Sequence, residues 1–137
     1  GIKSKKSKKD STSVLLPYAA KQREGMKKAI TGAIFKIDVD PTHPLAYGYD
    51  SNFYSLKNNE DTYEFLKSGN VGYIQKETKP LSGFAGSKIQ NDLENTLVFG
   101  VEDYKRGSVV YLVDNPLFRG FWENGKLLFA NAIFMVP

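Results

Sequence analysis

Five side chains of this sequence are of types that bind ligands, and they lie where strands are expected to end. They are His43, Tyr47, Asp114, Arg119 and Trp122. In a sheet flanked by helices, ligand sites form at the carboxyl ends of the strands, which makes these five residues candidate binding residues. For two of them we favour a structural role: a buried ion pair between Arg119 and Asp114 would join a strand to the helix that follows it.

A catalytic role for the single histidine is the weaker interpretation. His43 lies in a loop between Thr42 and Pro44, and no G-x-S-x-G motif supplies a serine nucleophile beside it. We therefore expect His43 to cap or brace a turn. Asp38 and Asp40 lie two residues apart on an expected strand and lack a third ligand, so we expect them to face water rather than a cation.

The composition excludes several classes of site. The chain has 137 residues, no cysteine and one histidine. It therefore has no disulfide scaffold, no cysteine nucleophile and no zinc site that needs two imidazoles. We predict no catalytic residue, no metal site and no cofactor in this chain. Its length suits one domain, and no apolar run approaches the roughly 20 residues of a membrane-spanning helix.

The net charge of +4 is concentrated at the N-terminal end. Residues 1–30 carry nine basic and two acidic side chains, whereas the remainder carries ten basic and thirteen acidic ones. The lysines of residues 3–9 are mixed with serines and have no aromatic neighbour, so we predict a solvated linker and no nucleic-acid binding. We expect residues 1–13 to be disordered. Gly1, with no initiator Met before it, suggests a cut or cloned fragment of a longer protein.

Residues 14–137 are expected to form a single domain with an α/β fold, or with an α+β fold as the alternative. Segment 108–113 is apolar after Ser108, as in a central strand covered on both faces. The apolar residues of 117–136 predict a helix that packs on the sheet through a wide face and is regular from Lys126 onward. Further helices are expected over 17–31 and 59–69, strands over 33–40, 45–49, 51–57 and 70–75, and a hairpin over 96–115.

Four sequence blocks resemble a known protein family. They are "GAIFKIDVDPTHPLAYGY", "SNFYSLK", "SGFAGSK" and above all "GSVVYLVDNPLFRGFWENGKLLFANAIFM". From about Pro17 to Pro137, the chain closely resembles the C-terminal region of secreted zinc carboxypeptidase family proteins of the Bacteroidetes type. In that family a peptidase domain is followed by a domain similar to class I glutamine amidotransferases. The resemblance implies a partial flavodoxin-like layered sheet with flanking helices.

The resemblance also implies that the amidotransferase activity has been lost. Working amidotransferases have a His-Pro-Glu turn after the final strand, whereas this chain has Asn115, Pro116 and Leu117 at the similar place. The cysteine nucleophile is absent as well. The zinc of the peptidase is held by a His-x-x-Glu pair and a distant histidine. It is therefore expected only in an upstream peptidase domain, because one histidine cannot supply that site.

We therefore expect a non-catalytic accessory domain of a zinc carboxypeptidase rather than an enzyme in its own right. It would pack on the peptidase domain or help to hold a peptide or glycopeptide substrate. A small-ligand, peptide or glycan binding module is the alternative, because the 13% aromatic content offers stacking surfaces. The expected partners are the upstream peptidase domain and, for an exposed half-sheet, a second copy. The resemblance places the protein in the periplasm or outside the cell.

Overall fold

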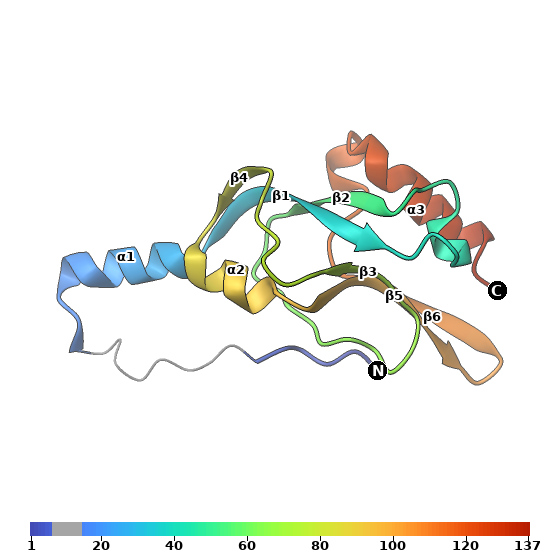
Figure 1. The fold of residues 1–137 in the computed structure, drawn as a ribbon, viewed down its shortest axis with the longest axis horizontal. Helices are drawn as coiled ribbons and strands as arrows, with labels where there is room; N and C mark the ends of the chain where they lie inside the picture. Colours follow the sequence, from blue (N-terminus) through green and yellow to red (C-terminus); the bar gives the residue numbers. More distant parts are fainter. Residues whose placement is uncertain (7–14) are drawn as a thin grey trace.

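The structure is a computed structural model that describes residues 1–6 and 15–137. Figure 1 shows a curled sheet with helix α1 projecting from one end and helix α3 lying at the other. The elements in these residues are α1 (Tyr18–Lys28), β1 (Ile30–Val39), η2 (Pro44–Ala46), β2 (Asn52–Lys57), β3 (Asn70–Ile74), β4 (Ser82–Ala85), α2 (Ser87–Leu93), β5 (Thr96–Tyr104), β6 (Gly107–Leu112), η3 (Phe118–Gly120) and α3 (Glu123–Phe134). This mixture of a sheet and flanking helices is consistent with an α+β fold.

Every strand pairing in the described residues is antiparallel. The sheet has the order β2-β1-β3-β5-β6, and β4 also pairs with β1. The flavodoxin-like expectation is not met in this part of the chain, because a flavodoxin-like sheet is parallel. Parallel neighbours need crossover connections of a dozen or more residues. Here only Lys105 and Arg106 join β5 to β6, so these two strands form the expected hairpin.

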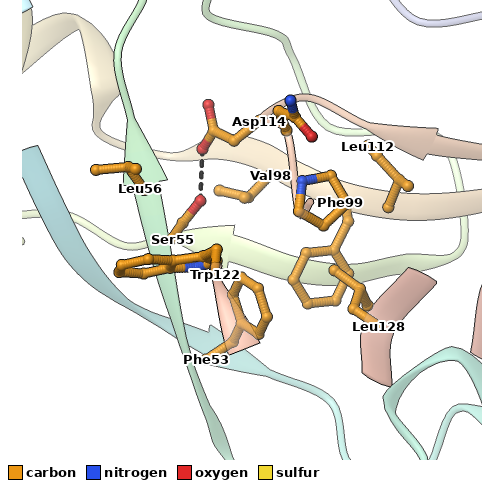
Figure 2. Close-up of a pocket in the computed structure, with 11 residues that line it drawn as sticks. Phe53, Ser55, Leu56, Val98, Phe99, Leu112, Asp114, Trp122 and Leu128 are labelled. Atoms are coloured by element: carbon orange, nitrogen blue, oxygen red, sulfur yellow. Dashed lines mark hydrogen bonds between the residues drawn. The ribbon is translucent and has the colours of Figure 1, made fainter. Parts of the chain in front are cut away.

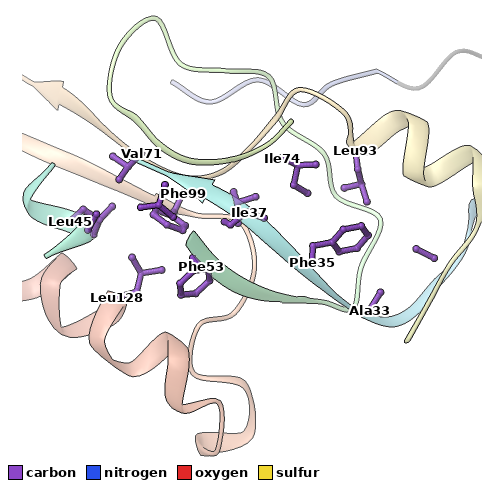
Figure 3. Packing of buried hydrophobic residues seen from close by; sticks show 14 of the residues in the cluster. Ala33, Phe35, Ile37, Leu45, Phe53, Val71, Ile74, Leu93, Phe99 and Leu128 are labelled. Atoms are coloured by element: carbon purple, nitrogen blue, oxygen red, sulfur yellow. The ribbon is translucent and has the colours of Figure 1, made fainter. Parts of the chain in front are cut away.

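The core lies on the inner face of the curled sheet and against the helices. On β1, Phe35 and Ile37 are buried while Lys36 between them is exposed, which confirms the alternation predicted from the sequence. The same apolar cluster includes Leu93 of α2 and Leu128 of α3 (Figure 3). One continuous core therefore joins the sheet to α2 and α3 but not to α1, among the α-helices of the described residues.

β6 is an end strand and not the central strand that its apolar sequence predicted. Within residues 1–6 and 15–137 it pairs with β5 alone, and its residues are partly or fully exposed. The strand that is buried on both faces is β5, from Thr96 to Val101. An apolar run predicts burial but does not say which neighbours provide it, so the two strands of the hairpin could not be distinguished by composition.

The curl of the sheet brings its two ends together. Ser55 and Lys57 on β2, the first strand in the sheet order, contact Asp114, which follows the last strand, β6. A twisted sheet of this kind would become a barrel if its end strands also paired through their backbones. In this chain, side chains bridge the open side of a half-barrel.

Helix α3 packs against η2 and β2 through a narrow face. Gly125, Leu128 and Asn131 recur every three residues and are buried. Gly125 lies so close to the preceding chain that an added Cβ would be 2.0 Å from the carbonyl oxygen of Pro116. The helix was predicted, but its wide apolar face is largely uncovered. The exposed apolar residues in and just after the helix are Leu127, Phe129, Ile133, Phe134 and Met135.

Two local segments differ from their predicted structure. Residues 45–49 form η2 and a turn instead of a strand, because His43 Nδ1 accepts a hydrogen bond from the Leu45 N–H and Pro44 begins the short helix. Residues 59–69 are irregular instead of helical. The side-chain amide of Asn70 binds both the N–H and the carbonyl group of Leu66, and so replaces helical partners.

The N-terminal residues 1–6 lie against the rest of the chain, although disorder was predicted over 1–13. Ser4 forms a β-bridge with Tyr63. The Lys5 ammonium donates to two backbone carbonyl groups at the C-terminal end of α2, where a positive charge is favourable. In this structure the first six residues are therefore packed on the rest of the chain, and the linker over residues 1–13 stays a prediction. The remainder of that segment lies outside the described residues.

Candidate functional site

Asp114 lies at the centre of the region in which the sequence predicted a binding site. Its carboxylate points inward between the two ends of the sheet. The Ser55 hydroxyl donates to Oδ2 at 2.6 Å, and the Lys57 ammonium donates to Oδ1 at 3.0 Å. All three residues are buried, with Lys57 only 2% exposed. Both carboxylate oxygens are therefore engaged by β2, and neither Asp114 nor Ser55 is presented to a substrate.

Arg119, the partner predicted for Asp114, lies elsewhere. Its side chain is exposed, and its guanidinium carbon lies 5.2 Å from the centre of the Phe118 ring. The backbone of Arg119 has a φ of 50°, in the left-handed region that residues other than glycine rarely occupy. The predicted pair of Arg119 with Asp114 is wrong. Lys57, which comes from the opposite end of the sheet, supplies the positive charge instead.

A small cavity lies beside the Asp114 carboxylate, as Figure 2 shows. Its lining includes Phe53, Leu112, Pro116 and Trp122. The cavity volume is about 10 Å³, which is room for about one water molecule. Sites that bind small molecules are much larger, at roughly 300–1,000 Å³. In this conformation the cavity does not admit a sugar or a peptide side chain.

Trp122 connects this cavity to the outer edge of β2. Its indole N–H donates to the carbonyl oxygen of Tyr54 at 3.2 Å, and the Asn124 side chain donates to the same oxygen at 2.9 Å. These two hydrogen bonds satisfy a backbone group of β2, which is the end strand of the sheet in the part of the chain that the structure describes. They also hold the beginning of α3 against β2. Trp122 and Asp114 thus meet at one cavity, and both are used to hold the chain together.

His43 and Tyr47 lie at η2 and do not line this cavity. His43 caps η2, which confirms the expectation that it braces a turn. Tyr47 is 65% exposed. The side-chain amide of Asn131 on α3 donates to the backbone carbonyls of both Leu45 and Tyr47, at 3.1 and 2.7 Å. The five candidate residues therefore do not converge on one pocket.

The Tyr49 hydroxyl is inserted into the hydrogen-bond ladder of α3. It donates to the Asn124 carbonyl at 2.5 Å and accepts from the Leu128 N–H at 2.8 Å. In a regular helix such groups, four residues apart, bond to each other. Burial raises the pKa of Tyr49, and the hydrogen bond from the Leu128 N–H acts in the opposite direction. Tyr49 thus joins the loop after η2 to α3.

Ser55, Lys57 and Tyr49 were missed by the sequence analysis. The alternation of β2 carried a signal for two of them, because Phe53 anchors a face on which Ser55 and Lys57 must also lie. A lysine on a buried face requires an acidic or hydrogen-bonding partner. The sequence could therefore indicate that Lys57 needs a carboxylate. Its identity as Asp114 depends on the curl of the sheet.

Among the described residues, no three His, Cys, Asp or Glu side chains lie close enough together to hold a metal ion. None of the helices in residues 1–6 and 15–137 is long and apolar enough to cross a membrane. Comparison of the chain with protein-family models, with curated proteins and with solved structures found no match.

Proposed function

We propose that this chain is a non-catalytic accessory domain of a zinc carboxypeptidase family protein, which packs on the peptidase domain or assists it. The resemblance of residues 107–135 to that family supports the proposal, as does the presence of Asn115 and Leu117 where an amidotransferase has its histidine and glutamate. Zinc and peptide hydrolysis would belong to the peptidase domain. The protein would act in the periplasm or outside the cell, as proteins of the family do.

One observation carries the proposal: the block that resembles the family most closely is occupied by contacts within the chain. Asp114 is bonded to Ser55 and Lys57, and Trp122 is bonded to the backbone of Tyr54. The cavity between them has a volume of about 10 Å³. Groups that are buried and already paired hold a fold together but do not reach a substrate. Residues 107–135 therefore have a structural role: they hold the fold of the chain together. A non-catalytic accessory domain needs no more of them than that.

The proposal is tested in the full-length protein by removing the region equivalent to residues 15–137. Peptide trimming and thermal unfolding of the peptidase domain are measured with and without it. We expect removal to lower the melting temperature of the peptidase domain, its kcat/KM, or both. Within the intact protein, Asp114→Asn should reproduce part of the loss because it breaks the buried pair, whereas the exposed Arg119→Ala should not. Unchanged stability and kinetics after removal would contradict the proposal.

A small-ligand, peptide or glycan binding module is the second candidate. Exposed aromatic and cationic groups near η2 and η3 favour it: Tyr47, Arg119 and Phe121 are all exposed, and Phe121 is 59% exposed. Exposed aromatic rings can stack on sugars and peptides. Titration of the chain with short peptides and oligosaccharides, followed by NMR, tests this function. Arg119→Ala should abolish binding and leave the fold intact, and the absence of any shift with every ligand would reject it.

A further inference from the structure

The outward side of α3 is apolar and uncovered. Leu127, Ala130, Ile133 and Phe134 are three or four residues apart, so they lie together on the side of the helix that faces away from the core. Ile133 is 57% exposed and Phe134 is 80% exposed. The charged residues of the helix are confined to its first turn, where Lys126 pairs with Glu123. Figure 1 shows α3 at the end of the sheet away from α1.

The area of this face can be compared with what a stable interface needs. A fully exposed aromatic side chain offers about 200 Å² and an aliphatic one about 100 Å². Phe129, four residues before Ile133, borders this face. The exposed fractions of Leu127, Ile133 and Phe134, together with that of Phe129 at the border, therefore amount to roughly 350 Å² of apolar surface per chain. Homodimer interfaces are about 65% apolar, so two such faces with their polar rims would bury roughly 1,100 Å² in total. That area lies just below the range of about 1,200–2,000 Å² for stable specific interfaces and fits a weak dimer.

We propose that the outward side of α3 is a self-association surface, on which α3 of a second copy of this chain packs in the antiparallel direction. The two helices would cross at Ala130, whose small side chain permits close approach of the helix axes. In this register Leu127 of one chain faces Ile133 of the other. Lys126 faces Phe134, so the Lys126 stem covers the ring and its ammonium lies near the ring face. This inference does not depend on the proposed function.

The pattern of the face favours a second copy over a different protein. A two-fold axis through Ala130 makes every contact occur twice, and each residue of the face then meets a residue of matching character. Apolar residues meet apolar ones, and the only charge near the centre of the face, on Lys126, meets an aromatic ring. The face is thus complementary to itself without a further partner.

Sedimentation velocity or light scattering of the purified chain at increasing concentration tests the proposal. We expect the mass to rise from 15.3 kDa toward twice that value. The dissociation constant should be on the order of 100 µM, as fits a small interface. Leu127→Lys and Ile133→Glu should each raise the dissociation constant at least about tenfold, because each places an unpaired charge in the apolar contact. Both residues are exposed in one chain, so the thermal melt should remain unchanged at concentrations well below the dissociation constant, where the unchanged chain is also monomeric.

A charge-swap experiment tests the register. Because Leu127 and Ile133 face each other across the two-fold axis, the double variant L127K/I133E should recover self-association, as should an equal mixture of the two single variants. Val109→Glu on the free edge strand β6 is the matched control, since Val109 is also exposed but lies outside the face. It should dimerise as the unchanged chain does.

Three outcomes would overturn the proposal. The first is a monomer throughout the concentration range up to about 1 mM, well above the expected dissociation constant. The second is loss of dimerisation in Val109→Glu with no change in Ile133→Glu, which would assign the interface to the edge of β6. The third is failure of both the double variant and the mixture to recover when all the chains are folded, because the antiparallel pairing then has no support.

Discussion

At the level of single residues, the buried pair of Lys57 and Asp114 determines what the region after β6 can do. Removing two charges from water costs several kcal/mol per ion, and only close geometry with further hydrogen bonds offsets this cost. The contact of 3.0 Å and the additional hydrogen bond from Ser55 meet that requirement. The pair therefore stabilises the fold only while it is complete. It leaves Asp114 without a free oxygen to act as a base.

We predict that Lys57→Met and Asp114→Asn each lower the free energy of unfolding by about 3–5 kcal/mol, because each leaves a buried group without its charged partner. The double variant should lose less than the sum of the single losses by about 1–3 kcal/mol, as for residues in direct contact. Urea unfolding of the three variants measures this coupling. Lys126→Met is the control, because its ion pair with Glu123 is exposed and should contribute less than about 1 kcal/mol. Additive losses would show that the two groups do not interact.

A second prediction for a single residue concerns Tyr49. Tyr49→Phe should lower the free energy of unfolding by about 1–2 kcal/mol at neutral pH, because two hydrogen bonds to α3 are lost. The folded pKa of Tyr49 is raised above its ordinary value of 10.0. Its contribution is thus complete below about pH 10 and declines above it, where the unfolded chain loses the tyrosine proton first.

Urea unfolding between pH 8 and pH 11 measures this effect, since that interval spans the ordinary pKa of about 10. The alkaline loss should be smaller in Tyr49→Phe than in the unchanged chain. Tyr111, whose pKa is also raised by its hydrogen bond to Glu102, would account for part of the remaining loss. Tyr47→Phe is the matched control, because the Tyr47 ring is exposed. An equal alkaline slope in all three chains would contradict the role given to Tyr49.

At the level of elements, α1 and β5 represent the two extremes of burial. α1 has no buried residue and contacts mainly α2, through an ion pair of Glu24 with Lys88 at 2.6 Å. Its C-terminal end is held more closely, because the Gly86 N–H donates to the carbonyl of Ala29 just after the helix. β5 lies between two strands and is buried from Thr96 to Val101. Isolated helices of this length are marginal in water, so α1 depends on a few contacts.

We therefore predict that the amides of α1 exchange with solvent deuterium at least about 100-fold faster than those of β5, because little of the core is lost when α1 opens. Protection within α1 should increase toward Lys28, where the helix approaches Gly86. Glu24→Gln should reduce it further by removing the pair with Lys88, whereas Glu64→Gln, an exposed change elsewhere, should leave it unchanged. Equal protection of α1 and β5 would mean that α1 unfolds only with the whole chain.

At the level of the whole molecule, the half-barrel is bridged at its open side by residues from distant parts of the chain. Ser55 and Lys57 come from the first strand in the sheet order, and Asp114 follows the last. Trp122 and Asn124 then hold α3 to the outer edge of β2. Opening this bridge would expose the core between the sheet and α3, so the bridge and the sheet should unfold together.

Trp122 provides a direct test, because it is the only tryptophan and lies at the bridge. We predict that its fluorescence and the far-UV circular dichroism of the sheet give the same thermal midpoint, within about 1 °C, as in two-state unfolding. Asp114→Asn should lower both midpoints together. A fluorescence change that precedes the loss of secondary structure would show that the bridge opens on its own.

The strands over residues 33–40, 51–57 and 70–75, together with the β5-β6 hairpin and the C-terminal helix, were predictable from local patterns. Their alternation, turn residues and helical periodicity lie within short segments. Segments 45–49 and 59–69 were predicted wrongly, because side chains of His43 and Asn70 bind backbone groups that the predicted structure would have used. Three of the five candidate residues, His43, Tyr47 and Arg119, lie away from the cavity at Asp114.

The sequence by itself determined which residues form most strands and helices, that His43 would brace a turn, and that the chain would have enough apolar side chains for one core. Tertiary structure alone decided that β6 lies at the edge, that Lys57 rather than Arg119 pairs with Asp114, and that α3 leaves its wider apolar side uncovered. The physical reason is distance along the chain. Local patterns arise from neighbours a few residues apart, whereas Lys57 and Asp114 are 57 residues apart and meet only after the sheet has curled.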